Sequence, residues 1–222
     1  MARGLFVIGT RTDVGKTYVS ALMVKKLVEA GILAGYYKAA QSGAKELEES
    51  DAGVVKGLSG TAQRIETMVS YSYPTAVSPH LAGRMEGRYA DLSVIRRDFE
   101  ALCKEADVVT VEGSGGIVCP LVYEEGQRLM LTDVIGALQL PVLLVTTSAL
   151  GSINEVVLTA EYAKARKIRL QGILVNRYHG GKMEEDNCRM MEALTGVKVL
   201  GYLAEGAKEF PVAAEDLLSW YE

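Results

Sequence analysis

The sequence has few cysteines, and their spacing excludes two classes of protein. Cys103, Cys119 and Cys188 are the three cysteines among 222 residues, widely spaced and odd in number. We therefore expect reduced thiols in a cytoplasmic protein rather than a disulfide framework or a zinc site. Buried thiols without a chemical role are the simplest interpretation of all three.

The sequence also lacks a basic excess and any long apolar run. Its formal net charge is −4 and its pI is near 5.4, which argues against a nucleic-acid binder because such a protein needs a basic surface. No apolar stretch approaches the ~20 residues of a membrane span, and the first residues lack the long apolar region of a signal peptide. We expect neither nucleic acid nor a membrane as a partner.

The composition that remains is that of a globular protein, with 49% apolar and 23% charged residues. A single domain spanning residues 1–222 is expected. Short apolar runs alternate with helix-period segments, which predicts a doubly wound, mostly parallel α/β sheet with helices on both faces. Residues 44–87 are the least regular part. The predicted strands are 5–8, 34–38, 108–111, 142–146, 172–175 and 197–202, and the predicted helices are 16–30, 92–105, 152–166, 184–194 and 213–221.

A phosphate-binding loop is predicted near the N-terminus. The apolar run LFVI at residues 5–8 leads into GTRTDVGKT at residues 9–17, and a helix-compatible stretch follows. Strand, glycine-bounded loop and helix wrap backbone N–H groups around a nucleotide's phosphates. Lys16 would reach the β- and γ-phosphates, and the Thr17 hydroxyl would ligate Mg²⁺. An ordinary strand–turn–helix with a chance Gly-Lys-Thr is the alternative.

This loop departs from the usual pattern. Gly9 and Gly15 bracket five residues instead of four, and Thr10 stands where a glycine is expected. A strict pattern search would therefore miss it.

Polar groups follow two other predicted strands, where ligands of such sheets gather. Lys38 closes the second predicted strand and Ser42 follows it, and the ammonium and hydroxyl suit a developing anion; a solvated lysine is the alternative interpretation. Glu112 ends a strand and precedes three glycines within four residues, which favours an Mg²⁺ ligand over a strand-end charge. Asp51 taken alone indicates a helix cap more often than a metal ligand. Asn176 follows a later strand, where its amide would read a base edge or simply favour a turn.

The order of these motifs resembles that of dethiobiotin synthetases. Along the chain stand GTRTDVGKT, YKAAQSG, SDA, SPH, VEGSGG, LPV and LGSIN, from Gly9 to Asn176. The family's loop carries the same insertion, which accounts for the spacing. Such an enzyme is an ATP-dependent ligase of the P-loop type that uses 7,8-diaminopelargonic acid and CO₂. The resemblance implies a carbamate, then a mixed carbamic–phosphoric anhydride, then closure of the ureido ring with loss of phosphate.

The resemblance also implies roles for individual residues. Lys16 and Lys38 would neutralise the phosphoryl group and the carbamate, and Thr12 and Ser42 would position the carbamate. The Mg²⁺ ligands would be Thr17, Asp51 and Glu112. The ATP site would comprise Asp13, Val14, Gly15, Lys16, Thr17, Tyr18, Asn176 and Ala204.

The family grips the substrate carboxylate across a homodimer interface. The matching positions are Leu150, Gly151, Ser152 and Asn154, at the start of a predicted helix whose free N–H groups suit a carboxylate in any case. Ser78 and Gly115 complete the implied substrate site.

Two departures from the family's pattern concern the nucleotide. Asp13 stands where many members have glutamate, and Ala204 lies in a segment that lacks the proline which often packs on the adenine. Purine selectivity would then depend on Asn176.

Three other classes compete with this interpretation. A partition- or cluster-carrier-type ATPase places a second lysine where this chain has Arg11, and arginine does not replace lysine in such tight geometry. A GTP-dependent switch module needs Asn-Lys-x-Asp, which the segment NRYH from Asn176 does not supply. Cobyrinate-type amidoligases usually carry an extra glutaminase domain, for which we expect no room.

Overall fold

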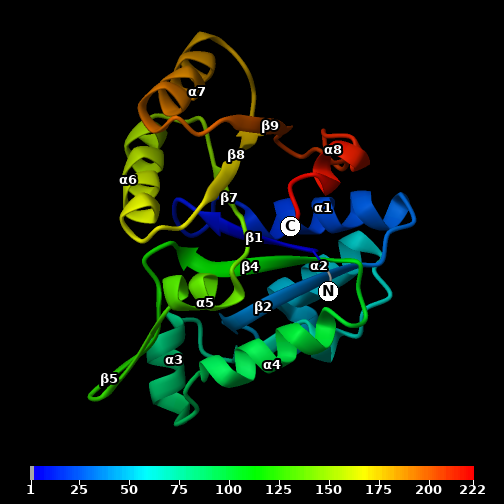
Figure 1. The fold of residues 1–222 in the computed structure, drawn as a ribbon, viewed down its shortest axis with the longest axis vertical. Helices are drawn as coiled ribbons and strands as arrows, with labels where there is room; N and C mark the ends of the chain where they lie inside the picture. The colour runs from blue at the N-terminus through cyan, green and yellow to red at the C-terminus, as the bar shows by residue number, and fades with distance from the viewer. Residues whose placement is uncertain (1–2) are drawn as a thin grey trace.

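The computed structural model describes residues 3–222, and its centre is a parallel sheet of seven strands. Apolar runs form the inner strands because both faces of the sheet are covered (Figure 1). The strand order is β3-β2-β4-β1-β7-β8-β9, and every pairing in it is parallel. The strands are β1 (Arg3–Gly9), β2 (Ala34–Ser42), β3 (Val69–Tyr73), β4 (Val108–Gly116), β7 (Val142–Thr146), β8 (Leu170–Tyr178) and β9 (Val199–Ala204).

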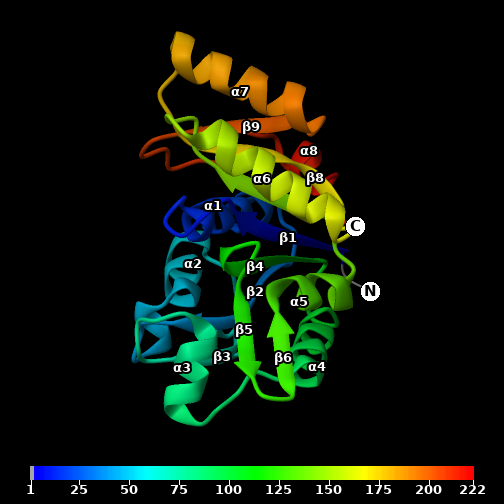
Figure 2. The ribbon, with the colours of Figure 1, turned by 90° about the vertical axis from the view of Figure 1, so that its left-hand side faces the viewer.

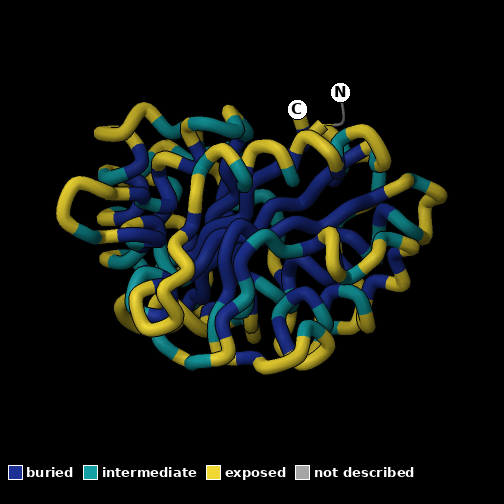
Figure 3. Tube along the Cα trace, turned by 90° about the horizontal axis from the view of Figure 1, so that it is seen from below, coloured by how far each residue is buried: buried dark blue, intermediate teal, exposed yellow. Residues whose placement is uncertain are grey.

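Helices cover both faces, and each face has its own apolar core. One core joins the sheet to α1, α2 and α8, and the other joins it to α4, α5, α6 and α7. Figure 3 shows the strands as the buried centre of the molecule and the surrounding loops as its exposed surface. The helices are α1 (Lys16–Glu29), α2 (Asp51–Ser59), α3 (Pro79–Glu86), α4 (Leu92–Leu102), α5 (Leu131–Leu138), α6 (Ser152–Ala165), α7 (Lys182–Thr195) and α8 (Ala214–Leu218), with 3₁₀ turns at Leu47–Glu49 and Ile65–Thr67.

The predicted doubly wound architecture is confirmed. Each predicted strand and helix is present, with ends that differ by a few residues. Two differences matter for the site: β2 continues to Ser42 and β4 to Gly116, so Lys38 and Glu112 lie within strands rather than at their ends.

Residues 44–87 are more regular than predicted, since they contain α2, β3 and α3. The sequence did not predict α2 because Gly53 and Gly57 lie within it, and glycine disfavours a helix interior. Gly53 has a packing reason, as a Cβ there would lie 2.0 Å from the Glu48 carbonyl oxygen. Ser50 caps this helix by accepting a hydrogen bond from the Gly53 N–H.

The prediction also missed an antiparallel hairpin and the helix after it. Strands β5 (Pro120–Glu124) and β6 (Gln127–Met130) form a separate two-stranded sheet and lead into α5. The hairpin extends beside α3 (Figure 2), where Arg84 donates hydrogen bonds to the Glu124 carboxylate and to the Tyr123 carbonyl.

Over the described residues, 3–222, none of the helices has the length and apolar character that a bilayer crossing requires.

Candidate active site

The loop between β1 and α1 has the predicted form. Gly15 caps α1 with φ of 90°, in the left-handed region that favours glycine. A Cβ at Gly15 would also lie 2.2 Å from Asn176 Nδ2, so a larger residue would displace the Asn176 side chain from the loop. Asp13 has φ of 64°, which turns the chain just before the helix. The backbone therefore curls around the start of α1, as phosphate binding requires.

Lys16 is buried at the start of α1, with 6% of its surface exposed. Its Nζ donates a hydrogen bond to the Arg11 carbonyl oxygen at 3.3 Å, across the loop. Burial lowers the pKa of Lys16, and the Glu112 carboxylate partly opposes this effect. A lysine in this position is a desolvated cation, which is favourable for holding phosphate oxygens.

Lys38 links the two predicted metal-binding carboxylates. Its Nζ lies 2.6 Å from Asp51 Oδ2 and 2.6 Å from Glu112 Oε1. Burial lowers the pKa of Lys38, but the Glu112 and Asp51 charges outweigh burial and the net shift is upward. For Asp51, burial raises the pKa, but the Lys38 charge and hydrogen bonds from Lys38 and Thr17 give a net decrease. Lys38 and Asp51 therefore both stay charged at neutral pH.

The Thr17 hydroxyl lies between the same carboxylates. Its Oγ1 is 3.0 Å from Asp51 Oδ1 and 2.9 Å from Glu112 Oε1. A hydroxyl has one proton and donates to one acceptor at a time, so Asp51 Oδ1 has no donor among the described residues when Thr17 donates to Glu112 Oε1.

These oxygens fit Mg²⁺. A hydroxyl and two carboxylates are hard ligands, and Mg²⁺ is commonly held by one or two carboxylates together with substrate phosphates. Within residues 3–222, no group of three or more His, Cys, Asp or Glu side chains forms a metal site.

A cavity of about 510 Å³ opens beside Lys38 and contains the predicted substrate residues. Ser42 Oγ donates to the Val77 carbonyl at 2.6 Å, and Ser78 Oγ lies 3.0 Å from His80 Nδ1. Thr12, Lys38, Ser42, Asp51, Ser78 and Gly115 all line this cavity.

Two further side chains of this cavity were not assigned from the sequence. Gln41 is buried, and its Oε1 has no hydrogen-bond partner within the described structure. Burial raises the pKa of the Cys119 thiol to about 11, so Cys119 is not a nucleophile at neutral pH.

The predicted carboxylate-binding residues lie outside this cavity. Leu150, Gly151, Ser152 and Asn154 begin α6, and none of them lines the cavity of the same chain. Leu150 is 90% exposed, while Ser152 is buried and its Oγ has no partner among the described residues. Leu150, Gly151 and Asn154 are therefore exposed at the surface, whereas Ser152 points into the protein.

The predicted nucleotide residues lie together. Asn176 Nδ2 donates to the Val14 carbonyl at 2.8 Å, so the amide supports the loop directly. The Tyr18 hydroxyl donates to the Ala207 carbonyl at 2.6 Å, which holds the segment after β9 against α1. Ala204, at the end of β9, is exposed.

Two residues near the site were missed in the sequence. The buried Tyr36 hydroxyl donates to Glu112 Oε2 at 3.0 Å, and the signal for it is its position two residues before Lys38, on the same face of β2. Glu155 contacts the loop residues Thr10 and Arg11, and no sequence pattern connects residues so far apart.

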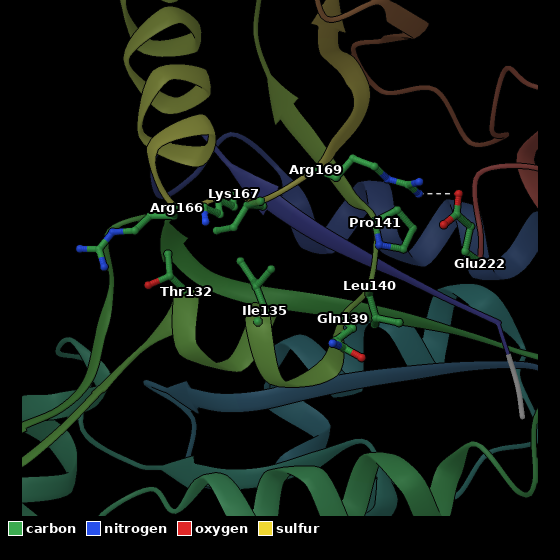
Figure 4. Close-up of a pocket in the computed structure, with 11 residues that line it drawn as sticks. Thr132, Ile135, Gln139, Leu140, Pro141, Arg166, Lys167, Arg169 and Glu222 are labelled. Atoms are coloured by element: carbon green, nitrogen blue, oxygen red, sulfur yellow. Dashed lines mark ion pairs between the residues drawn. The ribbon is translucent and has the colours of Figure 1, made fainter.

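A second cavity of about 400 Å³ contains none of the predicted residues. It lies between α5 and the segment that joins α6 to β8, and Arg169 forms an ion pair with Glu222 at its wall (Figure 4). Its lining comes from α5, residues 139–141 after it, residues 166–169 after α6 and Glu222, and it shares no residue with the cavity beside Lys38.

Sequence comparison identifies relatives over the whole chain. A family model described as an AAA domain matches residues 3–207. The ATP-dependent dethiobiotin synthetase BioD of Brachyspira hyodysenteriae is 42% identical over 207 residues, which is 93% of this chain and 94% of that protein. The protein of the same name from Clostridium botulinum is 40% identical over 228 residues, covering 100% of this chain and 99% of the relative.

Solved structures share the fold at much lower identity. MinD, a cell division protein of Aquifex aeolicus, has a TM-score of 0.58 at 14% identity, covering 99% of this chain and 95% of that chain. A plasmid partition protein from Borrelia burgdorferi has a TM-score of 0.60 at 10% identity, covering 98% and 96%. These similarities show the fold alone. The position that distinguishes the partition-type ATPases is Arg11 here, and its Nε lies 3.2 Å from the Glu155 carboxylate of the same chain.

Proposed function

We propose a mechanism, residue by residue, for a chain that belongs to the dethiobiotin synthetase family. The chain is an ATP-dependent ligase that forms dethiobiotin. Its single P-loop domain, residues 1–222, would carry both the nucleotide site and the carbamate site.

The proposal rests on one observation. Lys38 lies between Asp51 and Glu112, beside Thr17, and also lines the cavity that contains Thr12 and Ser42. A protonated lysine at the boundary between a metal-phosphate site and an organic-substrate cavity is placed to contact an anion formed between them.

In this mechanism the Thr12 and Ser42 hydroxyls orient the carbamate made from one substrate amine and CO₂. Lys38 neutralises the carbamate, and Lys16 holds the γ-phosphate. The carbamate oxygen attacks the γ-phosphorus while the bond from that phosphorus to ADP breaks, so ADP leaves. The neutral second amine then attacks the carbamic carbon of the anhydride, and the bond from that carbon to the phosphate oxygen breaks. The nitrogen gives its proton to solvent, the ring closes, and the negative charge of the departing phosphate stays near Lys16 and Lys38. Positioning and charge neutralisation carry most of the catalysis, as expected for phosphoryl transfer.

Thr17, Asp51 and Glu112 would hold Mg²⁺. Bound there, Mg²⁺ would supply positive charge that offsets the charge of the nucleotide's phosphates. Lys38, which now contacts both carboxylates, would then turn part of its hydrogen-bonding capacity to the substrate.

The nucleotide would lie along the loop and the start of α1. Backbone N–H groups of Asp13, Val14 and Gly15 would bind the phosphates, with Tyr18, Asn176 and Ala204 around the base. The support for the base position is that Asn176 and the segment after Ala204 both contact this part of the chain.

A homodimer would complete the substrate site. Leu150, Gly151, Ser152 and Asn154 of one subunit would bind the substrate carboxylate in the other, and Ser78 and Gly115 would contact the substrate from within. The exposure of Leu150, Gly151 and Asn154 around the start of α6 supports this arrangement.

We further propose that the enzyme works in the cytoplasm on small molecules, without nucleic-acid or membrane partners. Its net charge of −4 supports the absence of these two partners, because a negatively charged protein is not attracted to nucleic acid or to an anionic membrane surface.

A product assay tests the function. Purified protein is incubated with 7,8-diaminopelargonic acid, bicarbonate, Mg²⁺ and ATP, and dethiobiotin is measured by mass spectrometry. We expect dethiobiotin, ADP and phosphate in equal amounts. ATP hydrolysis without dethiobiotin would reject the proposal.

A further inference from the structure

Thr10 and Arg11 depart from the usual phosphate loop, and the mechanism above gives neither of them a role. Both contact Glu155, which lies in the first turn of α6. Thr10 Oγ1 donates a hydrogen bond to Glu155 Oε2 at 2.9 Å, and Arg11 Nε lies 3.2 Å from Glu155 Oε1. One carboxylate thus uses its two oxygens to hold two consecutive loop residues.

The contacts continue from these residues to the centre of the site. The Arg11 carbonyl oxygen accepts the hydrogen bond from Lys16 Nζ, and the Thr10 N–H donates to the Val145 carbonyl at 3.1 Å. Thr12, the next residue, lines the substrate cavity. The first half of the loop is therefore fixed by α6 on one side and by β7 and Lys16 on the other.

We propose that Glu155 is a positioning residue for the phosphate loop. It holds Thr10 and Arg11 so that the Arg11 carbonyl orients Lys16 and so that Thr12 faces the cavity. This inference rests on the proposed function for the identity of the ligands, MgATP and carbamate.

The ion pair and the hydrogen bond are expected to contribute unequally to holding the loop. The Arg11 and Glu155 side chains are 53% and 32% exposed, and an ion pair so exposed contributes little by itself. The Thr10 hydrogen bond is partly buried and fixes the second carboxylate oxygen. Attachment at two points restricts the loop more than either contact alone.

The position of Glu155 links two parts of the proposed site. Glu155 directly follows Asn154 in the turn proposed to bind a carboxylate of the other subunit. A single side chain therefore fixes that turn relative to the phosphate loop.

The test compares Glu155→Ala, Glu155→Gln and Arg11→Gln with the double variant Arg11→Gln/Glu155→Gln. Glu161→Gln is the matched control, since Glu161 is an exposed glutamate farther along the same helix. The MgATP dissociation constant is measured by calorimetry, and kcat and KM are measured with the product assay. Circular dichroism and the melting temperature report the fold.

We expect Glu155→Ala to weaken MgATP binding about 3- to 10-fold, the loss typical of one hydrogen bond with an exposed ion pair. The KM for ATP should rise by a similar factor, and kcat should also fall because Thr12 and Lys16 are less well oriented. Glu155→Gln keeps an acceptor for Thr10 and should fall between wild type and Glu155→Ala. The control should match wild type.

The double variant separates positioning from independent effects. If Arg11 and Glu155 act together, their effects on MgATP affinity will be non-additive. A folded Glu155→Ala protein with unchanged MgATP affinity and KM would overturn the inference. A lower melting temperature with unchanged affinity would also overturn it, because it would show a structural role only. Failure of the wild type to form dethiobiotin would reject the proposed function instead, and the MgATP affinities would still decide the role of Glu155.

Discussion

Lys38 on β2 and Glu112 on β4 are neighbours in register, with Nζ and Oε1 2.6 Å apart. Both side chains are buried, and removing one partner of such a pair leaves an unpaired charge in the interior. Asp51 from α2 contacts the same ammonium. The site is therefore built around a cation held by two anions, to which a second cation, Lys16, is added at the start of α1.

The first prediction concerns Lys16. Lys16→Ala should lower kcat for dethiobiotin formation by at least about 10²-fold, since it removes a preorganised charge from the phosphoryl group. We expect the fold to survive because the substitution removes a charged side chain from the phosphate loop and leaves the apolar core filled. Lys26→Ala, on the same helix, is the control. A folded Lys16→Ala enzyme with near wild-type turnover would contradict the phosphate-loop assignment.

The second prediction concerns the metal. Asp51→Asn and Glu112→Gln should each raise the Mg²⁺ concentration for half-maximal activity, by about tenfold, because each removes one anionic ligand. High Mg²⁺ should restore part of the rate if only affinity is lost. The exposed Glu48, as Glu48→Gln, serves as the control. An unaltered Mg²⁺ titration in both variants would remove these carboxylates from the metal site.

The third prediction concerns Tyr36, which orients Glu112 through its hydroxyl. Tyr36→Phe removes only that hydrogen bond and should weaken Mg²⁺ binding about tenfold in the presence of nucleotide, as loss of a residue that orients a metal ligand commonly does. Calorimetric titration with Mg²⁺ measures the change.

Tyr37→Phe is a matched control for this variant. The Tyr37 hydroxyl donates to the Ile95 carbonyl and contacts Ser70, away from the carboxylates. Its loss should lower stability by about 1 kcal/mol and leave Mg²⁺ affinity unchanged. Equal Mg²⁺ affinities for the two variants would show that Tyr36 has no part in the metal site.

The fourth prediction concerns the dimer. Lys16→Ala and Asn154→Ala should each be inactive or nearly so, but mixed dimers would contain one intact composite site. After equal mixing and subunit exchange, we expect about one quarter of the wild-type sites to be active, because half of the dimers are mixed and each has one intact site of two. Mass spectrometry of intact dimers monitors the exchange. Complete exchange without recovered activity would place the whole site in one chain.

The fifth prediction concerns nucleotide selectivity. Contacts of Lys16, Thr17 and the carboxylates to phosphate and metal do not depend on the base. The wall of the base pocket at Ala204 lacks a packing proline and is exposed, so its contribution to base binding should be small. We expect ATP to be preferred, with CTP or GTP used at a measurable fraction of its kcat/KM. Comparison of the three values is decisive: discrimination well above ~10³-fold, about 4 kcal/mol, would indicate a tighter base pocket.

The amino-acid sequence by itself determined the fold class and the phosphate loop. Short apolar runs such as residues 142–146, alternating with helix-period segments, favour strands covered on both faces, and this pattern is readable along the chain. The loop from Gly9 to Thr17 is also a local feature, since strand, turn and helix are continuous in the chain. The order of the motifs was enough to indicate the family, because the order does not depend on distances in space.

Only the tertiary structure decided which side chains meet. Parallel strands adjacent in the sheet are distant in sequence, so the register of Lys38 with Glu112 and the hydrogen bond from Tyr36 depend on the strand order. The attachment of Thr10 and Arg11 to Glu155 depends on the position of α6 beside the loop, for the same reason. The irregular segment 44–87 acquires α2 and β3 because packing against α1 and β2 compensates for weak local propensity. Propensity acts along the chain, whereas these contacts are determined by how the sheet brings distant segments together.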